Sequence, residues 1–203
     1  MVAMKTYDKI MESSYRLFLE KGFHEVSWAD ISEEAEISPG TLYYYFKTKD
    51  ELILAVLDTY VLEYYYDFLN NAKKVKGSAY NRLKGFYRES LGLDKDYAPK
   101  YLSNQQTDYK KMLLLSFEGI QKYSQISDNY NEYNKVYTQA IEDFVELGKK
   151  NGEINPELST EELTLFIKSS INGVFFLWIV QDDLDVRHIV EVNVDSVWDY
   201  MKK

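Results

Sequence analysis

The sequence of 203 residues contains no cysteine, three prolines and two histidines. The absence of cysteine excludes a disulfide framework and any cysteine-based metal site. His24 and His188 lie far apart and have no acidic neighbour at the spacing of a metal site, so we expect neither a metal nor a cofactor. The hydrophobic fraction of 45% is too high for a disordered chain. The length fits one medium domain, or a small domain joined to a larger one.

Long hydrophobic runs and positive charge are also scarce. The most apolar stretch, GVFFLWIV at 173–180, is eight residues long, whereas a membrane span needs about 20. The opening MVAMKTYDK lacks the apolar segment of a secretory signal. We therefore expect a cytoplasmic protein with no membrane partner. The formal charge is −9, from 24 basic and 33 acidic side chains, and this alone argues against a nucleic-acid partner.

Enzyme motifs are missing as well. The sequence contains no GxSxG elbow, no phosphate-binding Walker loop and no GxGxxG fingerprint. Its carboxylates are scattered along helical segments, as on solvated faces. These observations favour a protein that is not an enzyme.

Apolar residues recur at helical spacing through almost the whole chain, which predicts an all-α fold of about nine or ten helices. Residues 1–48 predict three short helices, and a long helix is expected from 49 to about 74. Ser27, Ser38 and Thr48 have the sequence context of helix N-caps. Later breaks are expected at 76–78, 92–99, 103–107, near 127, at 151–156 and at 181–185.

Two of the short helices form a helix-turn-helix pattern, with the turn between Ala35 and Ser38. On a helical wheel, Leu42 and Phe46 point to one side of the second helix, toward the core. The opposite side gathers Gly40, Tyr43, Tyr44 and Lys47. This composition suits a surface that approaches DNA closely, because Tyr and Lys donate to phosphates.

Residues 10–52 resemble the DNA-binding domain of the tetracycline-repressor (TetR) family of transcription regulators. The matching residues include Ile10, Leu17-Phe18, Glu20 to Phe23, Ser27, Ile31, Ala35, Ile37-Ser38, Gly40, Leu42-Tyr43, Tyr45-Phe46, Lys49 and Leu52, and SPGTLYYYFKTKDEL is the most specific segment. The resemblance implies a helix-turn-helix domain over 1–48 and a larger ligand-binding and dimerisation domain over 49–203. It also implies a repressor that binds a palindromic operator as a homodimer and is released by a small-molecule effector.

The residues expected to contact double-stranded DNA are Ser27, Ser38, Pro39, Gly40, Thr41, Tyr43, Tyr44, Tyr45, Lys47, Thr48 and Lys49. Glu36 stands where the family usually has Gly, so we expect a strained or reshaped turn. Residues 1–60 hold six basic and eleven acidic side chains. This balance keeps an alternative open, namely a helical small-molecule-binding or interaction protein without DNA-binding activity.

Two further sets of residues are expected to act in the second domain. Aromatic residues crowd the region 60–125, where an apolar or aromatic effector, or a cationic one, is expected. The candidates are Tyr64, Tyr65, Phe68, Phe86, Tyr87, Tyr101, Tyr109, Met112 and Phe117. The helices at 128–150 and 159–181 carry long apolar stripes and are expected to form the dimer interface, through Tyr137, Ile141, Phe144, Ile167, Ile171, Gly173, Val174 and Trp178.

Overall fold

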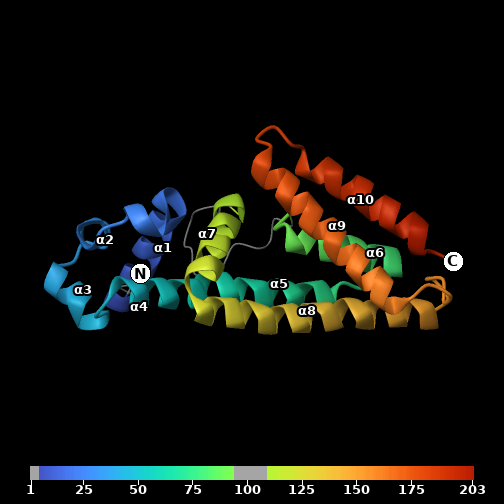
Figure 1. Cartoon of the computed structure of the whole chain (residues 1–203), viewed down its shortest axis with the longest axis horizontal. Coiled ribbons are helices and arrows are strands. Elements are labelled where there is room, and N and C mark those ends of the chain that lie inside the picture. The colour runs from blue at the N-terminus through green and yellow to red at the C-terminus, as the bar shows by residue number, and fades with distance from the viewer. Residues whose placement is uncertain (1–4, 94–108) are drawn as a thin grey trace. The chain divides into compact units, whose positions relative to one another are not determined.

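The computed structural model describes residues 5–93 and 109–203. These residues form ten α-helices and one π-helical segment, which confirms the all-α prediction (Figure 1). They divide into two compact units. Residues 5–64 and 109–130 belong to unit 1, and residues 65–93 and 131–203 belong to unit 2. The domain boundary expected after residue 48 falls inside unit 1, because the following helix packs on the first one.

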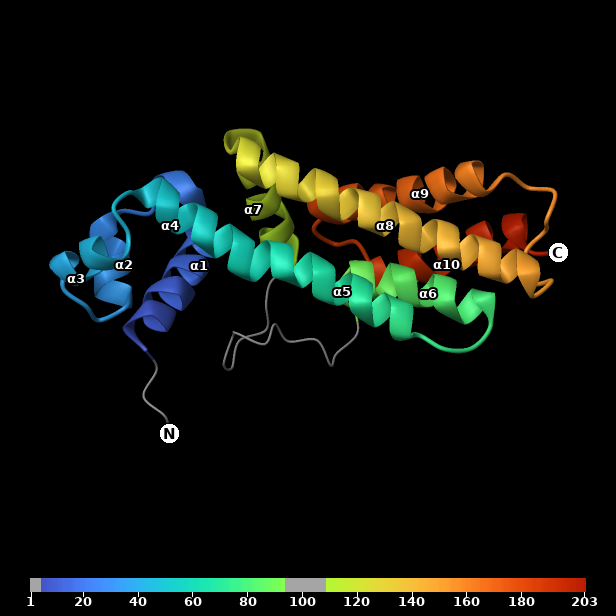
Figure 2. The same ribbon diagram turned by 90° about the horizontal axis from the view of Figure 1, so that it is seen from below.

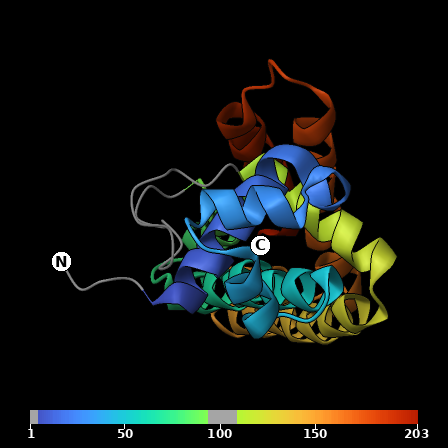
Figure 3. The ribbon, with the colours of Figure 1, turned by 90° about the vertical axis from the view of Figure 1, so that its left-hand side faces the viewer.

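Unit 1 contains the helix-turn-helix, which faces the viewer in blue in Figure 3. Its helices are α1 (Thr6–Glu25), α2 (Trp28–Glu34), α3 (Pro39–Tyr45), α4 (Lys49–Val56) and α7 (Tyr109–Lys122). Helix α1 contacts α2, α4 and α7. The side chains of Ile10, Ile31, Leu42 and Leu52 are fully buried in this unit, so the predicted apolar stripes do form its core.

Local signals in the sequence explain where these helices begin and end. Gly22 adopts a φ of +75°, a left-handed conformation that favours glycine, and it interrupts α1. The side chains of Ser27, Ser38 and Thr48 each accept a backbone N–H in the first turn of the following helix. The three predicted N-caps are therefore confirmed.

The predicted continuous α-helix over 49–74 is wrong in its middle. Helix α4 is followed by a π-helical segment, Leu57–Leu62, and then by α5 (Glu63–Lys74). Within unit 1, Tyr60 of this segment stacks on Tyr15, with ring centroids 4.5 Å apart. Asp58 accepts hydrogen bonds from Asn129 at 3.1 Å and Gln125 at 3.5 Å. These contacts hold the widened turn in place, and burial raises the pKa of the Asp58 carboxyl.

Unit 2 contains α6 (Ala79–Ser90), α9 (Thr160–Val180) and α10 (Val186–Met201), together with most of α5 and of α8 (Ser124–Lys150). Helix α10 packs against both α6 and α9, and the pair α9 and α10 is clear in Figure 1. Helices α5 and α8 run side by side in Figures 1 and 2, joined by aromatic contacts between Phe68 and Tyr137 at 5.7 Å. The predicted break near 127 is absent, since α8 runs unbroken from Ser124 to Lys150.

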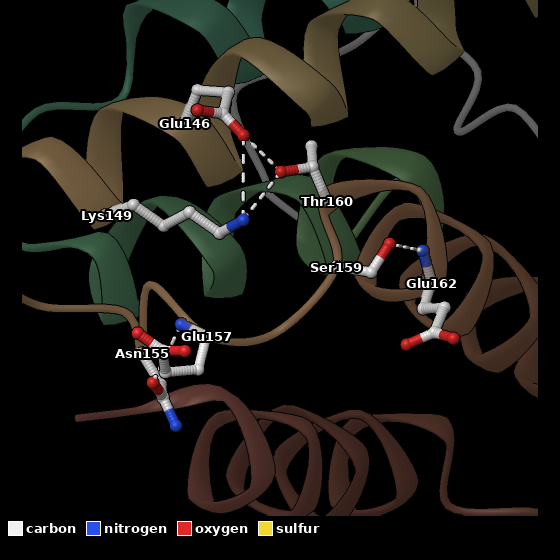
Figure 4. Close-up of polar contacts among 7 residues, drawn as sticks. All are labelled: Glu146, Lys149, Asn155, Glu157, Ser159, Thr160 and Glu162. Carbon is white, nitrogen blue, oxygen red and sulfur yellow. Dashed lines mark hydrogen bonds and ion pairs between the residues drawn. The ribbon is translucent and has the colours of Figure 1, made fainter.

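The connection between α8 and α9 is fixed by polar contacts at the start of α9 (Figure 4). The Ser159 hydroxyl accepts the backbone N–H of Glu162 at 3.3 Å and so caps α9. Lys149 Nζ donates to Thr160 Oγ1 at 2.7 Å, and the Thr160 hydroxyl donates to Glu146. That hydrogen bond lowers the pKa of the Glu146 carboxyl.

Candidate DNA-binding surface

One residue in the turn of the helix-turn-helix has a left-handed backbone conformation although it is not glycine. Glu36 has a φ of +54°, in the left-handed region that a residue with a Cβ rarely adopts. The turn is closed by two backbone hydrogen bonds, from Glu36 N to Glu33 O at 3.1 Å and from Ile37 N to Ser32 O at 2.9 Å. The Glu36 carboxylate lies 3.7 Å from Lys9 Nζ. The fold therefore tolerates a residue that its backbone geometry disfavours.

Helix α3 presents the face that the helical wheel predicts. Leu42 is fully buried and Phe46, directly after the helix, is 6% exposed, whereas Tyr44 is 76% exposed. Tyr43 is about half exposed. At Gly40 an added Cβ would meet only Ser38 Oγ, at 3.8 Å. The chain's own packing thus gives no reason for a glycine here.

Two aromatic residues outside α3, which were not among the expected site residues, support this face. The ring of Trp28, the first residue of α2, lies 5.1 Å from that of Tyr43. Tyr7 of α1 lies 6.0 Å from Tyr45. A signal was available for Trp28, since it directly follows Ser27, a residue already expected to contact DNA. These contacts restrain the rings of the exposed tyrosines.

Several expected phosphate donors already have partners within the chain. The Ser27 hydroxyl donates to Asp30 at 2.6 Å, and this bond is the main cause of the lowered pKa of Asp30. The hydroxyls of Ser38 and Thr41 lie 2.9 Å apart and bond to each other. These groups therefore stabilise helix ends in the DNA-free chain, and any bond to phosphate must share or replace the present one.

The lysines of this surface differ in their environments. Lys47 Nζ donates to the carbonyl oxygens of Tyr43 at 3.0 Å and Tyr44 at 3.4 Å, at the end of α3. Lys49 is half-buried, and burial followed by the nearby charge of Lys122 lowers its pKa. A DNA phosphate beside Lys49 would counter both effects, because an anion favours the protonated ammonium.

The sequence of this surface matches a known family. Residues 10–56 match the family model described as bacterial regulatory proteins, tetR family. The chain belongs to the TetR family.

Known proteins similar to this TetR-family chain are regulators of transcription or metabolism. A fatty acid metabolism regulator protein of Bacillus subtilis is 21% identical over 176 residues, covering 87% of this chain and 84% of that protein. The transcriptional regulator QacR of Staphylococcus aureus is 27% identical over 173 residues, covering 84% and 85%. A crystal structure of a transcriptional regulator from Saccharomonospora viridis in complex with choline has a TM-score of 0.78 at 21% identity, covering 96% of each chain. This TetR-family chain is therefore a DNA-binding transcription regulator with the fold of these proteins.

The expected effector residues of the TetR-family chain fall into both units. In unit 1, Tyr64 and Met112 are buried, whereas Phe117 is 48% exposed. In unit 2, Phe86 packs against Phe144 at 5.8 Å, and Tyr87 is fully buried. Tyr101 and the side chain of Tyr109 lie outside the described residues. The structure therefore does not bring all the expected residues together within one unit.

Two of these residues, Tyr65 and Phe68, belong to an aromatic cluster in unit 2 together with three other tyrosines. Tyr65 stacks on Tyr133 with centroids 5.0 Å apart, and Phe68 contacts Tyr133 at 6.2 Å and Tyr137 at 5.7 Å. Tyr66 meets the edge of Tyr133 at 5.7 Å and is partly exposed. We call Tyr65, Tyr66, Phe68, Tyr133 and Tyr137 the aromatic cluster.

A cavity of unit 2 lies elsewhere. It has a volume of about 480 Å³ and is lined by Gln181, Asp182, Asp183, Leu184, Asp185, His188 and Ile189. None of the expected effector residues lines it. Among the described residues, no group of three or more His, Cys, Asp or Glu side chains could hold a metal ion.

Most of the expected dimer residues are core residues of the TetR-family chain itself. Six of them are at most 8% exposed: Tyr137, Ile141, Phe144, Ile167, Ile171 and Val174. They pack inside unit 2, so they offer little surface to a partner. Trp178 is half-buried, and Gly173 is exposed with no atom within 4 Å of an added Cβ.

The apolar side chains that unit 2 leaves exposed on α9 and α10 are different ones. They are Leu165, Phe166, Phe176, Leu177, Val180, Val192 and Tyr200. Phe176 and Leu165 are 66% and 65% exposed. We call these seven residues and Gly173 the α9–α10 face. An apolar surface of this kind is typical of interaction sites.

Helix α9 is also the one described helix that could span a membrane by length and composition. An 18-residue window within Thr160–Val180 has a mean hydropathy of 1.7, and 28% of it is buried. The expectation from the sequence counted only the eight-residue run at 173–180, whereas the apolar composition of this helix extends back to Leu163. Core and interface helices of water-soluble proteins have the same composition, so this feature is weak evidence for a membrane span.

Proposed function

We propose that this chain is a repressor that binds a palindromic operator as a homodimer and leaves the DNA when a small molecule binds. The main support for operator binding is the exposed face of α3, where Gly40 and Tyr44 lie one helical turn apart. A glycine inside a helix costs about 0.5–1 kcal/mol relative to alanine. Since nothing in the chain needs the space at Gly40, we infer that DNA occupies it.

The substitution Gly40→Ala tests this inference. It should raise the free energy of unfolding by about 0.5–1 kcal/mol, yet it should weaken binding to the operator, because the new methyl group meets the DNA. Binding is measured by gel shift on the DNA upstream of the chain's own gene, and unfolding by circular dichroism. A variant that is more stable and binds equally well would remove the argument for close approach at Gly40.

The same binding experiment separates the two candidate functions. A repressor binds one DNA fragment far more tightly than unrelated DNA of equal length. The alternative, a helical ligand-binding or interaction protein, binds neither. The acidic balance of residues 1–60, six basic against eleven acidic side chains, is the observation behind that alternative, and both the family match of residues 10–56 and the α3 face oppose it.

For the homodimer we propose the α9–α10 face as the contact surface. Its exposed apolar side chains and the open space at Gly173 would let a second copy approach closely. An obligate interface buries more than about 2,000 Å² in total. Burial of this face would also keep α9 away from lipid, consistent with a cytoplasmic protein.

Three charge substitutions compare this face with the exposed side of α8. Phe176→Glu on α9 should give a monomer in light scattering at micromolar concentration and abolish operator binding, as should Gly173→Glu. Val136→Glu changes an exposed apolar side chain of α8, 41% exposed, and should leave the dimer intact. If Val136→Glu dissociates the dimer and Phe176→Glu does not, the interface lies on α8 instead.

For the effector we propose a small molecule with an apolar or aromatic body, and a quaternary ammonium compound as the first class to test. The aromatic cluster supports this choice, because ring faces attract cations, and the structural neighbour from Saccharomonospora viridis holds choline. Choline and longer alkyl ammonium salts are titrated against the operator complex, with acyl chains of equal length as the contrasting class. Release by the acyl compounds alone would exclude the cationic effector.

A further inference from the structure

The recognition helix α3 lacks the side chains that usually read base edges by hydrogen bonding. Its sequence is PGTLYYY, which contains no Arg, Lys, Asn, Gln, Asp or Glu. In the major groove, Arg or Lys bonds guanine O6 and N7, and Asn or Gln bonds adenine N6 and N7. Helix α3 can make none of these bidentate contacts.

The nearby groups that could substitute for them are engaged. The hydroxyls of Ser38 and Thr41 bond to each other at 2.9 Å. Lys47, just beyond the helix, donates to the carbonyl oxygens of Tyr43 and Tyr44. If Lys47 turned to a guanine, it would give up two hydrogen bonds that satisfy the end of α3.

The exposed surface that remains on α3 is mostly apolar. It consists mainly of the Pro39 ring, the Cα of Gly40 and three tyrosine rings, of which Tyr44 is 76%, Tyr43 49% and Tyr45 39% exposed. Tyr43 packs against Trp28 and Tyr45 against Tyr7, so the Tyr44 ring is the most accessible of the three. Gly40 and Tyr44 lie one helical turn apart, on the same side of α3. Because Gly40 has no side chain, the base edges in the DNA major groove can come close to Pro39 and Tyr44.

One base presents an apolar group in the major groove, namely thymine, through its 5-methyl group. We propose that this chain selects its operator half-sites through thymine methyl groups packed against Pro39, Gly40 and Tyr44, and not through hydrogen bonds to guanine. The proposal rests on the operator-binding repressor function proposed above. It assigns A·T-rich half-sites as the DNA that this regulator recognises.

The test uses operator DNA in which single thymines are replaced by deoxyuridine, which lacks only the methyl group. Loss of one buried methyl corresponds to about a fourfold increase in Kd. At the contacted positions we expect this increase in fluorescence anisotropy titrations. Exchanging a contacted T·A pair for C·G should weaken binding further, and 5-methylcytosine in place of that cytosine should restore part of the loss.

A second set of duplexes carries 7-deazaguanine, which removes the N7 acceptor. Binding should stay within about twofold of the unmodified operator, because no donor is expected at N7. A tenfold loss with 7-deazaguanine, or no loss with deoxyuridine at any position, would overturn the proposal. Absence of specific binding to the unmodified operator would instead overturn the proposed function, so the two failures are distinguishable.

Two protein variants complete the test. Tyr44→Ala should weaken binding and abolish the deoxyuridine effect at the position that Tyr44 contacts. Lys49→Gln, at a residue expected to contact phosphate, should weaken binding and leave the deoxyuridine effect unchanged. A deoxyuridine effect that survives intact in Tyr44→Ala would contradict the role of this ring.

Discussion

Replacement of Glu36 measures how much the left-handed backbone in the turn of the helix-turn-helix lowers the free energy of unfolding. Glu36 has a φ of +54°, where a residue with a Cβ is disfavoured by about 1–2 kcal/mol. Glycine avoids that penalty but loses about 0.5–1 kcal/mol through the entropy of the unfolded chain. The net expectation is that Glu36→Gly is more stable than Glu36→Ala by about 0.5–1 kcal/mol.

The alanine variant is the matched control, because both variants remove the same carboxylate. Either change removes the ion pair with Lys9, whose 3.7 Å contact involves a glutamate side chain that is 83% exposed. Such a pair contributes about 0–1 kcal/mol, and this loss cancels in the comparison. Glu36→Asn should fall between the two, since asparagine tolerates left-handed backbone better than alanine.

Thermal unfolding of the full chain, followed by circular dichroism, provides the measurement. For a protein of this size, 1 kcal/mol corresponds to about 2–4 °C in Tm, so Glu36→Gly should melt about 1–4 °C above Glu36→Ala. DNA affinity should rise in both variants alike, because both lose one negative charge near the phosphates. An alanine variant as stable as the glycine variant would show that the turn carries no strain.

Three further predictions concern other parts of the chain. The pKa of Asp58 is raised by burial, so its protonated form favours the fold; the stability it contributes is present below its unfolded pKa and is lost as pH rises through its folded pKa. Asp58→Asn keeps an acceptor for Asn129 and should therefore be at least as stable as the wild type at pH 7. In urea titrations, the difference in free energy of unfolding between variant and wild type should shrink below pH 4. A difference that stays constant with pH would contradict this reasoning. In Gly148→Ala the added Cβ would overlap the side chain of Ile154, so the variant should be less stable by about 1–3 kcal/mol in chemical unfolding, whereas an unchanged midpoint would mean that Ile154 moves freely. Lys49→Ala should weaken binding to all DNA sequences and flatten the salt dependence of log K by about one unit per half-site, and a changed choice of operator would refute its role as a phosphate contact.

Features that depend on neighbouring residues could be predicted from the sequence. The caps at Ser27, Ser38 and Thr48 need only a side chain and the next turn of backbone. The burial of Leu42 and Phe46 follows from helical periodicity. For these reasons the helix-turn-helix and its exposed face were predicted correctly.

Features that depend on tertiary packing could not. The π-helical segment at 57–62 has no signature of its own, because its residues suit an α-helix equally well. Ile141 and Ile167 belong to apolar stripes, but the sequence does not say whether the chain or a partner covers them. Lys47 was expected to point to DNA, and only the structure shows that its ammonium caps α3.

The contact between Trp28 and Tyr43, 5.1 Å between ring centres, gives this protein an intrinsic fluorophore beside the surface expected to meet DNA. The sequence has three tryptophans. Trp178 and Trp198 lie on α9 and α10 and can be replaced by phenylalanine, which leaves Trp28 as the one indole emitter. A shift or quenching of its emission on adding operator would then report binding in real time without any attached dye. Stopped-flow mixing of this variant would yield the association rate and, with an effector in the second syringe, the rate of release.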